Sequence, residues 1–212
     1  MEIQEKVKKL SEIFRDWLPL PETELIHDNV YELIVAVILS AQCTDKRVNL
    51  ITPAFYNRFP DLKSLAAAKF EDVFELIKSC SYPNNKSRHL IAMAKAVFEK
   101  FNGKIPSSLE ELQQLPGIGR KTANVILSVA FNKSAMPVDT HVFRVAQRIG
   151  LAKPSKTPFE VEKQLTDIIP EKQLHDFHHW LIFHGRITCQ ARKPKCEVCQ
   201  IKDYCDFFLN RQ

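Results

Sequence analysis

The stretch LPGIGRKT occupies residues 115–122 and holds two of the five glycines in this chain of 212 residues, Gly117 and Gly119. Apolar residues recur at helical spacing on both sides of it, so PGIG predicts a tight turn between two helices. Pro116 fixes one backbone dihedral, and each glycine can adopt a positive φ. Bare amides here could also approach a phosphate closely; the alternative is a tight turn without a ligand.

Two cations follow this turn directly. Arg120 and Lys121 fall in the first turn of the expected helix 120–131, where the helix dipole disfavours positive charge. A bound phosphate would offset this effect for Arg120, and Lys121 could lose its proton and act as a nucleophile. The alternative interpretation is that both side chains are simply solvated.

Helical periodicity extends along nearly the whole chain and predicts an all-α protein, because no segment alternates as a strand. Helix starts are indicated at Thr44, at Ser108 with Glu111 as a capping box, and at Thr157 with Pro158. The segment NKSAMPVD, residues 132–139, is the expected boundary between two lobes. The expected helices cover residues 5–18, 29–41, 45–58, 61–67, 70–78, 86–101, 108–114, 120–131, 141–149, 158–168 and 171–185.

The composition is that of an ordinary globular protein, with 45% hydrophobic and 26% charged residues. The longest strictly apolar run is Leu33 to Leu39, too short to cross a bilayer, and MEIQEKVKKL is no secretory signal. We therefore expect an intracellular protein. Its 30 basic and 25 acidic residues suit a polyanionic partner without establishing one.

Four of the six cysteines lie close together, at Cys189, Cys196, Cys199 and Cys205. Intracellular thiols are kept reduced, so clustered cysteines favour a metal site over disulfides. The intervening segment is basic and carries Arg192, Lys193 and Lys195. Cys43 and Cys80 are expected to be small buried hydrophobes. The histidines of the apolar helix LHDFHHWLIFH are expected to pack or to bond the backbone rather than to bind metal: His175, His178, His179 and His184.

Taken together, these motifs closely resemble endonuclease III, the family of helix-hairpin-helix DNA glycosylases with an iron-sulfur cluster. The resemblance rests on LPGIGRKTANVIL, on VDTHVFRV at 138–145 and on the cysteine spacing C-x6-C-x2-C-x5-C. LSAQCTDKRVN at 39–49 and HHWLIFHGRITCQARKPKC at 178–196 extend it over nearly the whole chain. It implies a helical barrel lobe at residues 22–133 and a second lobe of residues 1–21 and 134–212, with DNA in the cleft between them.

The resemblance implies a four-iron four-sulfur (4Fe-4S) cluster on the four clustered cysteines, with zinc as the alternative occupant. It also implies that Lys121 attacks C1′ of a damaged nucleoside and that Asp139 assists. Helix 120–131 carries the chain about 16 Å from Lys121, and residues 132–138 can span up to about 23 Å, so Asp139 can return to the lysine. The alternative role for Asp139 is an N-cap of the following helix.

Contacts to DNA are implied for the turn residues Gly117, Gly119, Arg120 and Thr122, for His141, and for the basic residues Arg192, Lys193 and Lys195. Gln42 is implied as a wedge that fills the space left by the extruded base, although it could instead be a polar C-cap. The segment CSYPNNK, residues 80–86, departs from the family pattern and places Ser81 where relatives carry a leucine. Tyr82 could stack on a base there, or pack on the protein as a turn residue.

The resulting expectation is a base excision repair enzyme that removes oxidised pyrimidines from duplex DNA through a lysine Schiff base and then cuts the abasic site. We expect it to act as a monomer in the cytoplasm, associated with the nucleoid. A monofunctional adenine or mismatch glycosylase is one alternative, and a non-catalytic DNA-binding module is another. Lys121 together with Asp139 argues against both.

Overall fold

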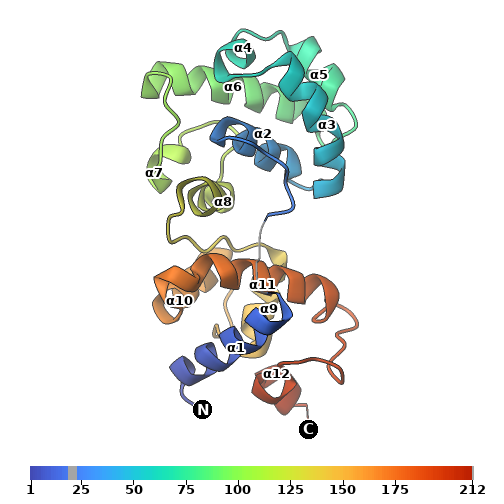
Figure 1. Cartoon of the computed structure of the whole chain (residues 1–212), viewed down its shortest axis with the longest axis vertical. Helices are drawn as coiled ribbons and strands as arrows, with labels where there is room; N and C mark the ends of the chain where they lie inside the picture. The colour runs from blue at the N-terminus through green and yellow to red at the C-terminus, as the bar shows by residue number, and fades with distance from the viewer. Residues whose placement is uncertain (19–22, 212) are drawn as a thin grey trace. The chain divides into compact units, whose positions relative to one another are not determined.

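The computed structural model describes residues 1–18 and 23–211 of the chain. These described residues form helices joined by turns, with no strand among them, which confirms the all-α prediction (Figure 1). The helices of the first half are α1 (Ile3–Trp17), α2 (Val30–Ser40), α3 (Asp45–Arg58), α4 (Leu62–Ala66), α5 (Phe70–Ile77) and α6 (Pro83–Phe101). Those of the second half are α7 (Leu109–Leu112), α8 (Arg120–Phe131), α9 (Thr140–Ile149), α10 (Pro158–Ile168), η1 (Glu171–Gln173), α11 (Leu174–Ile187), η2 (Lys202–Tyr204) and α12 (Asp206–Leu209).

The chain divides into two compact units. Unit 1 comprises Met1–Glu22 and Ser134–Gln212, and unit 2 comprises Thr23–Lys133. The division between Lys133 and Ser134 lies within the segment 132–139 in which the sequence places a lobe boundary. Residue 22, the expected first residue of the barrel lobe, lies outside the described residues.

Unit 2 is built around α2, which is apolar on all sides. Every residue from Leu33 to Leu39 is buried, as expected for a helix surrounded by others. Helices α3, α6 and α8 pack directly against α2. The long apolar run that stands out in the sequence is therefore the centre of this unit.

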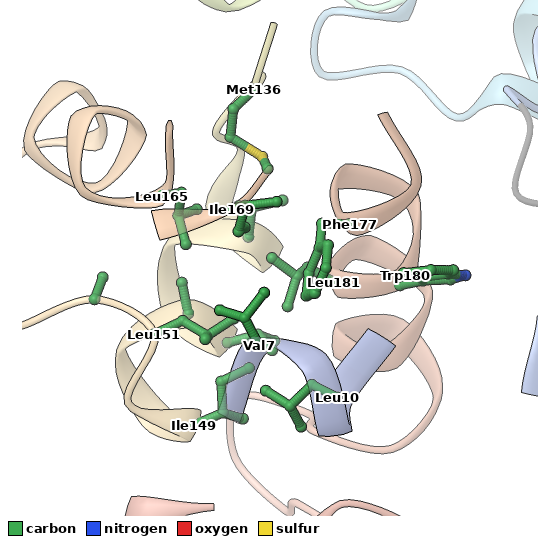
Figure 2. Close-up of a cluster of buried hydrophobic side chains, with 14 of the residues drawn as sticks. Val7, Leu10, Met136, Ile149, Leu151, Leu165, Ile169, Phe177, Trp180 and Leu181 are labelled. Carbon is green, nitrogen blue, oxygen red and sulfur yellow. The ribbon is translucent and has the colours of Figure 1, made fainter. Parts of the chain in front are cut away.

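Unit 1 joins the first helix of the chain to its last third. Val7 and Leu10 of α1 point into the same core as Leu151 and Leu181 (Figure 2). At the other end of α1, the Nε1–H of Trp180 donates to the carbonyl oxygen of Leu18 at 2.8 Å. Helix α1 is thus held in place by residues that lie more than a hundred positions away in the sequence.

The capping residues predicted from the sequence begin helices as expected. The side chain of Thr44 accepts from the amide of Arg47, that of Ser108 from Glu111, and that of Thr157 from Glu160. The predicted capping box differs in its second contact, because the Glu111 carboxylate accepts from Ser108 Oγ at 2.7 Å, where a capping box would use the Ser108 amide. Each cap satisfies an amide that would otherwise lack a partner in the first helical turn.

The largest differences from the predicted helices are at α6, at α11 and near the carboxyl terminus. Helix α6 begins at Pro83 and not at residue 86, because proline at the first helical position loses no intrahelical hydrogen bond and has a helical φ. Residues 171–173 form a separate 3-10 turn before α11, which continues to Ile187. The short helices η2 and α12 were not predicted, since they lie among the cysteines without a periodic apolar pattern.

The histidines of α11 pack within unit 1. His178, His179 and His184 are buried, and His178 Nδ1–H donates to the carbonyl oxygen of Pro137 at 2.9 Å. The ring of His184 lies 5.6 Å from that of Phe14. Among the described residues, no helix is long and apolar enough to span a membrane.

Burial of His179 predicts a pH-dependent stability. Burial, together with the nearby His175 and Arg186, lowers the pKa of His179 from 6.5 to about 4. Between these values the unfolded chain binds a proton that the folded chain does not, so the free energy of unfolding falls as the pH falls from 6.5 to 4. His179→Gln should remove this component, on the order of 1 kcal/mol between pH 7 and pH 5.

Thermal unfolding midpoints at pH 7 and pH 5, recorded at one scan rate, measure this effect. The difference between the two midpoints should be smaller in His179→Gln than in the unmodified protein. His27→Gln, at a half-buried histidine of unit 2, is the control and should keep the full difference. An unchanged difference in His179→Gln would refute the assignment.

Candidate functional site

The turn before α8 is anchored by two apolar side chains, with Leu115 and Ile118 only 2% and 4% exposed. Gly117 has a φ of +82°, and a Cβ there would lie 2.9 Å from the Cβ of His89. Gly119 differs from the prediction, because its φ is −88° in extended backbone. It is the N-cap of α8, a position that requires extended and not left-handed backbone. A Cβ on Gly119 would meet no atom within 4 Å, so this glycine faces open space.

Helix α8 begins without a side-chain cap, because its N-cap is glycine. The first amides of the helix, with the positive end of its dipole, therefore point past Gly119. Lys121 is exposed in this first turn, while Arg120 and Thr122 are half-buried beside it. These residues give unit 2 a concentrated positive surface at the turn.

Asp139 is the N-cap of α9 in unit 1. Its Oδ1 accepts from the amides of His141 and Val142 at 2.8 and 2.7 Å. The N-cap that the sequence offered as the alternative role of Asp139 is therefore present. Both cap hydrogen bonds use the same oxygen, so the cap does not engage Oδ2. Asp139 and Lys121 belong to different units.

His141 lies half-buried beside this cap. Its Nδ1 is 3.3 Å from the Nη2 of Arg144, which also donates to the carbonyl oxygens of Gly185 and Cys189 at 3.0 and 3.1 Å. A chain of hydrogen bonds thus connects the start of α9 to the first cysteine of the carboxyl-terminal cluster.

Gln42 and Tyr82 both have left-handed backbone, with φ values of 55° and 56°. Such values are uncommon for residues other than glycine and collect at functional sites. Both residues are exposed, Tyr82 by 62%, which argues against packing of Tyr82 on the protein. Ser81 Oγ donates to the carbonyl oxygen of Gln42 at 2.6 Å, so the loops that carry these two residues are joined.

Lys86, rather than Gln42, caps the end of α2. The Nζ of Lys86 donates to the carbonyl oxygens of Leu39 and Ala41 at 2.7 and 2.8 Å, and the residue is buried. The sequence does not predict this contact or the one from Ser81. Nothing local in the sequence indicates either, because each joins segments about forty positions apart.

The four clustered cysteines line one cavity with about 300 Å³ of empty space, part of it open to solvent. Cys189 and Cys205 are buried, whereas Cys196 and Cys199 are half-buried. Burial raises the pKa of Cys199 to about 11 and also raises that of Cys205. Metal coordination deprotonates such thiols, so they require a bound group to become thiolates.

Side-chain nitrogen atoms lie beside three of the four sulfur atoms of this cavity. The Nη1 of Arg148 donates to the Sγ of Cys189 at 3.6 Å, and the Nη1 of Arg211 donates to the Sγ of Cys196 at 4.0 Å. The Nε2 of His184 lies 3.8 Å from the Sγ of Cys199, and burial lowers the pKa of His184 to about 4. Two cations and a neutral imidazole therefore suit sulfur ligands that carry negative charge.

The basic segment between Cys189 and Cys196 is anchored at both ends. Arg148 donates to the carbonyl oxygens of Gln190 and Ala191 at 2.8 and 2.9 Å, and the amide of Lys195 donates to Thr188 at 2.9 Å. Three basic side chains of the segment are exposed: Arg192, Lys193 and Lys195. This basic loop, residues 190–195, is fixed by the fold and presents its cations outward.

Two family profiles match the chain. Residues 35–171 match the HhH-GPD superfamily base excision DNA repair protein family, and residues 189–205 match the iron-sulfur binding domain of endonuclease III. The second match covers the four thiols that line the cavity. The match to an iron-sulfur binding domain favours a 4Fe-4S cluster over zinc, and the four thiols with their neighbouring cations fit such a cluster.

Relatives resemble the chain along almost its full length. Endonuclease III of Rickettsia conorii is 47% identical over 204 residues, covering 96% of this chain and 97% of that protein. Endonuclease III of Escherichia coli is 41% identical over 204 residues, covering 95% and 96%.

Solved structures agree with this assignment. A trapped covalent intermediate of an endonuclease III with DNA superposes with a TM-score of 0.92 at 37% identity, covering 100% of this chain and 99% of that one. A thermostable thymine-DNA glycosylase shares the fold, with a TM-score of 0.87 at 21% identity over 97% of this chain and 98% of that chain. The chain belongs to the endonuclease III family of base excision DNA repair proteins.

Proposed function

We propose that this protein removes oxidised pyrimidines from duplex DNA, acting as a monomer, with Lys121 as the nucleophile. As a member of its family it is a bifunctional DNA glycosylase and abasic-site lyase. The observation that carries the residue assignment is the exposed lysine in the first turn of α8, directly behind a helix start without a side-chain cap. Preference for oxidised pyrimidines rests on family membership.

The turn before α8 is the proposed phosphate site. Gly117 takes the left-handed backbone that the turn requires, and Gly119 leaves open space beside the first amides of the helix. A phosphate oxygen can approach those amides, and the helix dipole favours its negative charge. Arg120 and Thr122, on either side of Lys121, are proposed as further contacts to the same strand.

A phosphate held at this turn places the adjoining sugar next to Lys121. The lysine amine attacks C1′, the glycosidic bond breaks, and the released base leaves with a proton. The C1′–O4′ bond then breaks and the ring oxygen takes a proton, which converts the adduct into a Schiff base with an open sugar. The Schiff base acidifies the proton on the neighbouring carbon, C2′. Loss of that proton breaks the bond to the 3′ phosphate, which is the lyase step.

Asp139 is proposed to support this chemistry from unit 1. Its Oδ1 is occupied by the α9 cap, which fixes the orientation of the carboxylate. The carboxylate would stabilise the positive charge that develops on the sugar as the base departs. The capping and catalytic roles use the same side chain without conflict.

The remaining proposed contacts hold the duplex around the extruded nucleotide. Gln42 would enter the space that the base leaves, and Tyr82 would stack on a base close by, since both are exposed on joined loops. His141, at the start of α9, is proposed to contact the DNA backbone. The basic loop would bind phosphates through Arg192, Lys193 and Lys195.

Lys121→Gln should abolish covalent trapping, because the substituted side chain has no nucleophilic amine. The measurement is incubation with borohydride and a duplex that contains thymine glycol, followed by gel separation of protein-DNA adducts. Lys104→Gln, at another exposed lysine of unit 2, is the matched control and should form the adduct normally. An adduct from Lys121→Gln would overturn the nucleophile assignment. Equal trapping of undamaged duplex would overturn the substrate assignment.

Asp139→Asn separates the cap from the charge, because asparagine caps helices about as well as aspartate. The unfolding midpoint should stay unchanged, while single-turnover base release should slow by about 100-fold, as typical for loss of a catalytic carboxylate. Asp61→Asn provides a control at another N-cap aspartate, in unit 2. Base release at the unmodified rate in Asp139→Asn would show that the residue is only a cap.

Gly119→Ala tests the phosphate site, because the new methyl group would occupy space that is now open. Affinity for a duplex with a stable tetrahydrofuran abasic analogue should fall by about tenfold, while the unfolding midpoint should fall only slightly, since alanine is a poorer N-cap than glycine. Gly117→Ala is the contrasting variant and should lower stability by about 1–2 kcal/mol, since its backbone is left-handed. Full affinity in Gly119→Ala would contradict a phosphate at this turn.

A further inference from the structure

Two cysteines outside the iron-sulfur site form a pair in unit 2. Cys43 lies between α2 and α3 and is half-buried, and Cys80 lies between α5 and α6 and is 5% exposed. The residues next to them are in contact, because Ser81 Oγ donates to the carbonyl oxygen of Gln42 at 2.6 Å, and Cys43 lies close enough to Cys80 to raise the pKa of its thiol. The fold therefore brings together two thiols that are 37 positions apart in the sequence.

The surrounding contacts hold this pair in place. The amide of Cys43 donates to Ser40 at 3.0 Å, and that of Cys80 donates to Ile77 at 2.8 Å, so each cysteine sits in a closed turn. Beside them, Ser81 Oγ reaches the carbonyl oxygen of Gln42, and Lys86 reaches the end of α2. The two turns are thus joined before any covalent bond forms.

We propose that Cys43 and Cys80 are an oxidation site at which a low-molecular-weight disulfide forms a bond between the two sulfurs. The bond would link the loop of Gln42 to that of Tyr82. A disulfide requires sulfur atoms about 2.05 Å apart, and the hydrogen bond between Ser81 and Gln42 already holds together the two turns that carry the thiols. The cysteines of the iron-sulfur site belong to unit 1 and are engaged by the cluster.

The reaction proceeds by two thiol-disulfide exchanges. Cys43, the more exposed thiol, loses its proton and attacks the small disulfide, which releases one small thiol and leaves a mixed disulfide. Cys80 then loses its proton and attacks the Cys43 sulfur, which releases the second small thiol. Two protein thiols are oxidised while one small disulfide is reduced to two thiols.

The environments of the two sulfurs support this order. Burial, with the adjacent Cys43, raises the pKa of Cys80 to about 11, so Cys80 stays protonated and shielded from solvent oxidants. The nearby charges of Lys86 and Arg47 act in the opposite direction and favour the Cys80 thiolate. A mixed disulfide on Cys43 places the electrophilic sulfur directly beside this thiol.

The consequence for DNA binding rests on the proposed function. Gln42 precedes Cys43 directly, and Tyr82 lies two residues after Cys80, both exposed with left-handed backbone. Shortening the distance between the sulfurs draws the Gln42 loop toward the start of α6. The oxidised protein should therefore bind the tetrahydrofuran duplex about tenfold more weakly, and a reducing thiol should restore the affinity.

The test uses the holoenzyme treated with oxidised glutathione, blocked with iodoacetamide and digested for mass spectrometry. The expected product has an intact mass lower by two hydrogen atoms and a linked peptide that joins Cys43 to Cys80. Cys43→Ser should give neither, and its DNA affinity should not respond to the oxidant. Absorbance near 400 nm, which the iron-sulfur cluster supplies, must be unchanged by the treatment.

Each outcome decides a separate point. Absence of the linked peptide, or linkage of either residue to a different cysteine, would overturn the oxidation site. A complete 43–80 link with unchanged DNA affinity would overturn its effect on binding. Failure of the Lys121 trapping experiment would leave the link itself in place, so the oxidation site and the proposed function fail independently.

Discussion

The ammonium group of Lys86 determines where α2 stops, and the loops around it follow from that. From the first turns of α6 it donates to two carbonyl oxygens at the end of a helix that is buried on every side. Burial lowers the pKa of Lys86, but loss of the side chain would leave two carbonyl groups without a donor. Because α2 ends at Ser40, the chain turns at Gln42 in left-handed backbone and remains exposed. The position of the proposed wedge therefore depends on a lysine that is itself buried.

Local rules account for what the sequence predicted well. Thr44, Ser108 and Thr157 each cap a helix through an amide three residues ahead, so the signal and the structure lie within one turn of each other. Gly117 follows the same logic, since the turn itself requires its positive φ. Gly119 does not have a positive φ, because it is the N-cap of α8 and an N-cap residue has extended backbone. The residue type alone indicated a positive φ, whereas the position at the start of the helix determined the backbone.

Long-range contacts explain what the sequence could not predict. Ser81 and Gln42 are 39 positions apart, Lys86 and Leu39 are 47 apart, and Arg148 and Gln190 are 42 apart. A side chain that reaches so far leaves no periodic pattern, and a lysine or serine in a loop usually faces solvent. The proposed roles of Lys121 and Asp139 rest on the resemblance to the family. Residue types alone favoured a solvated lysine and an ordinary cap.

One buried histidine of α11, His178, helps to fix the segment that leads to Asp139. Met136 and Val138 are buried in the core of unit 1, and the carbonyl oxygen of the intervening Pro137 accepts from His178 Nδ1–H. Asp139 follows directly and is held in turn by the first amides of α9. Asp139 therefore lies at the end of a segment whose backbone is held by hydrogen bonds and by burial in the core. A histidine that invited a metal-binding interpretation instead fixes the backbone that presents the proposed catalytic carboxylate.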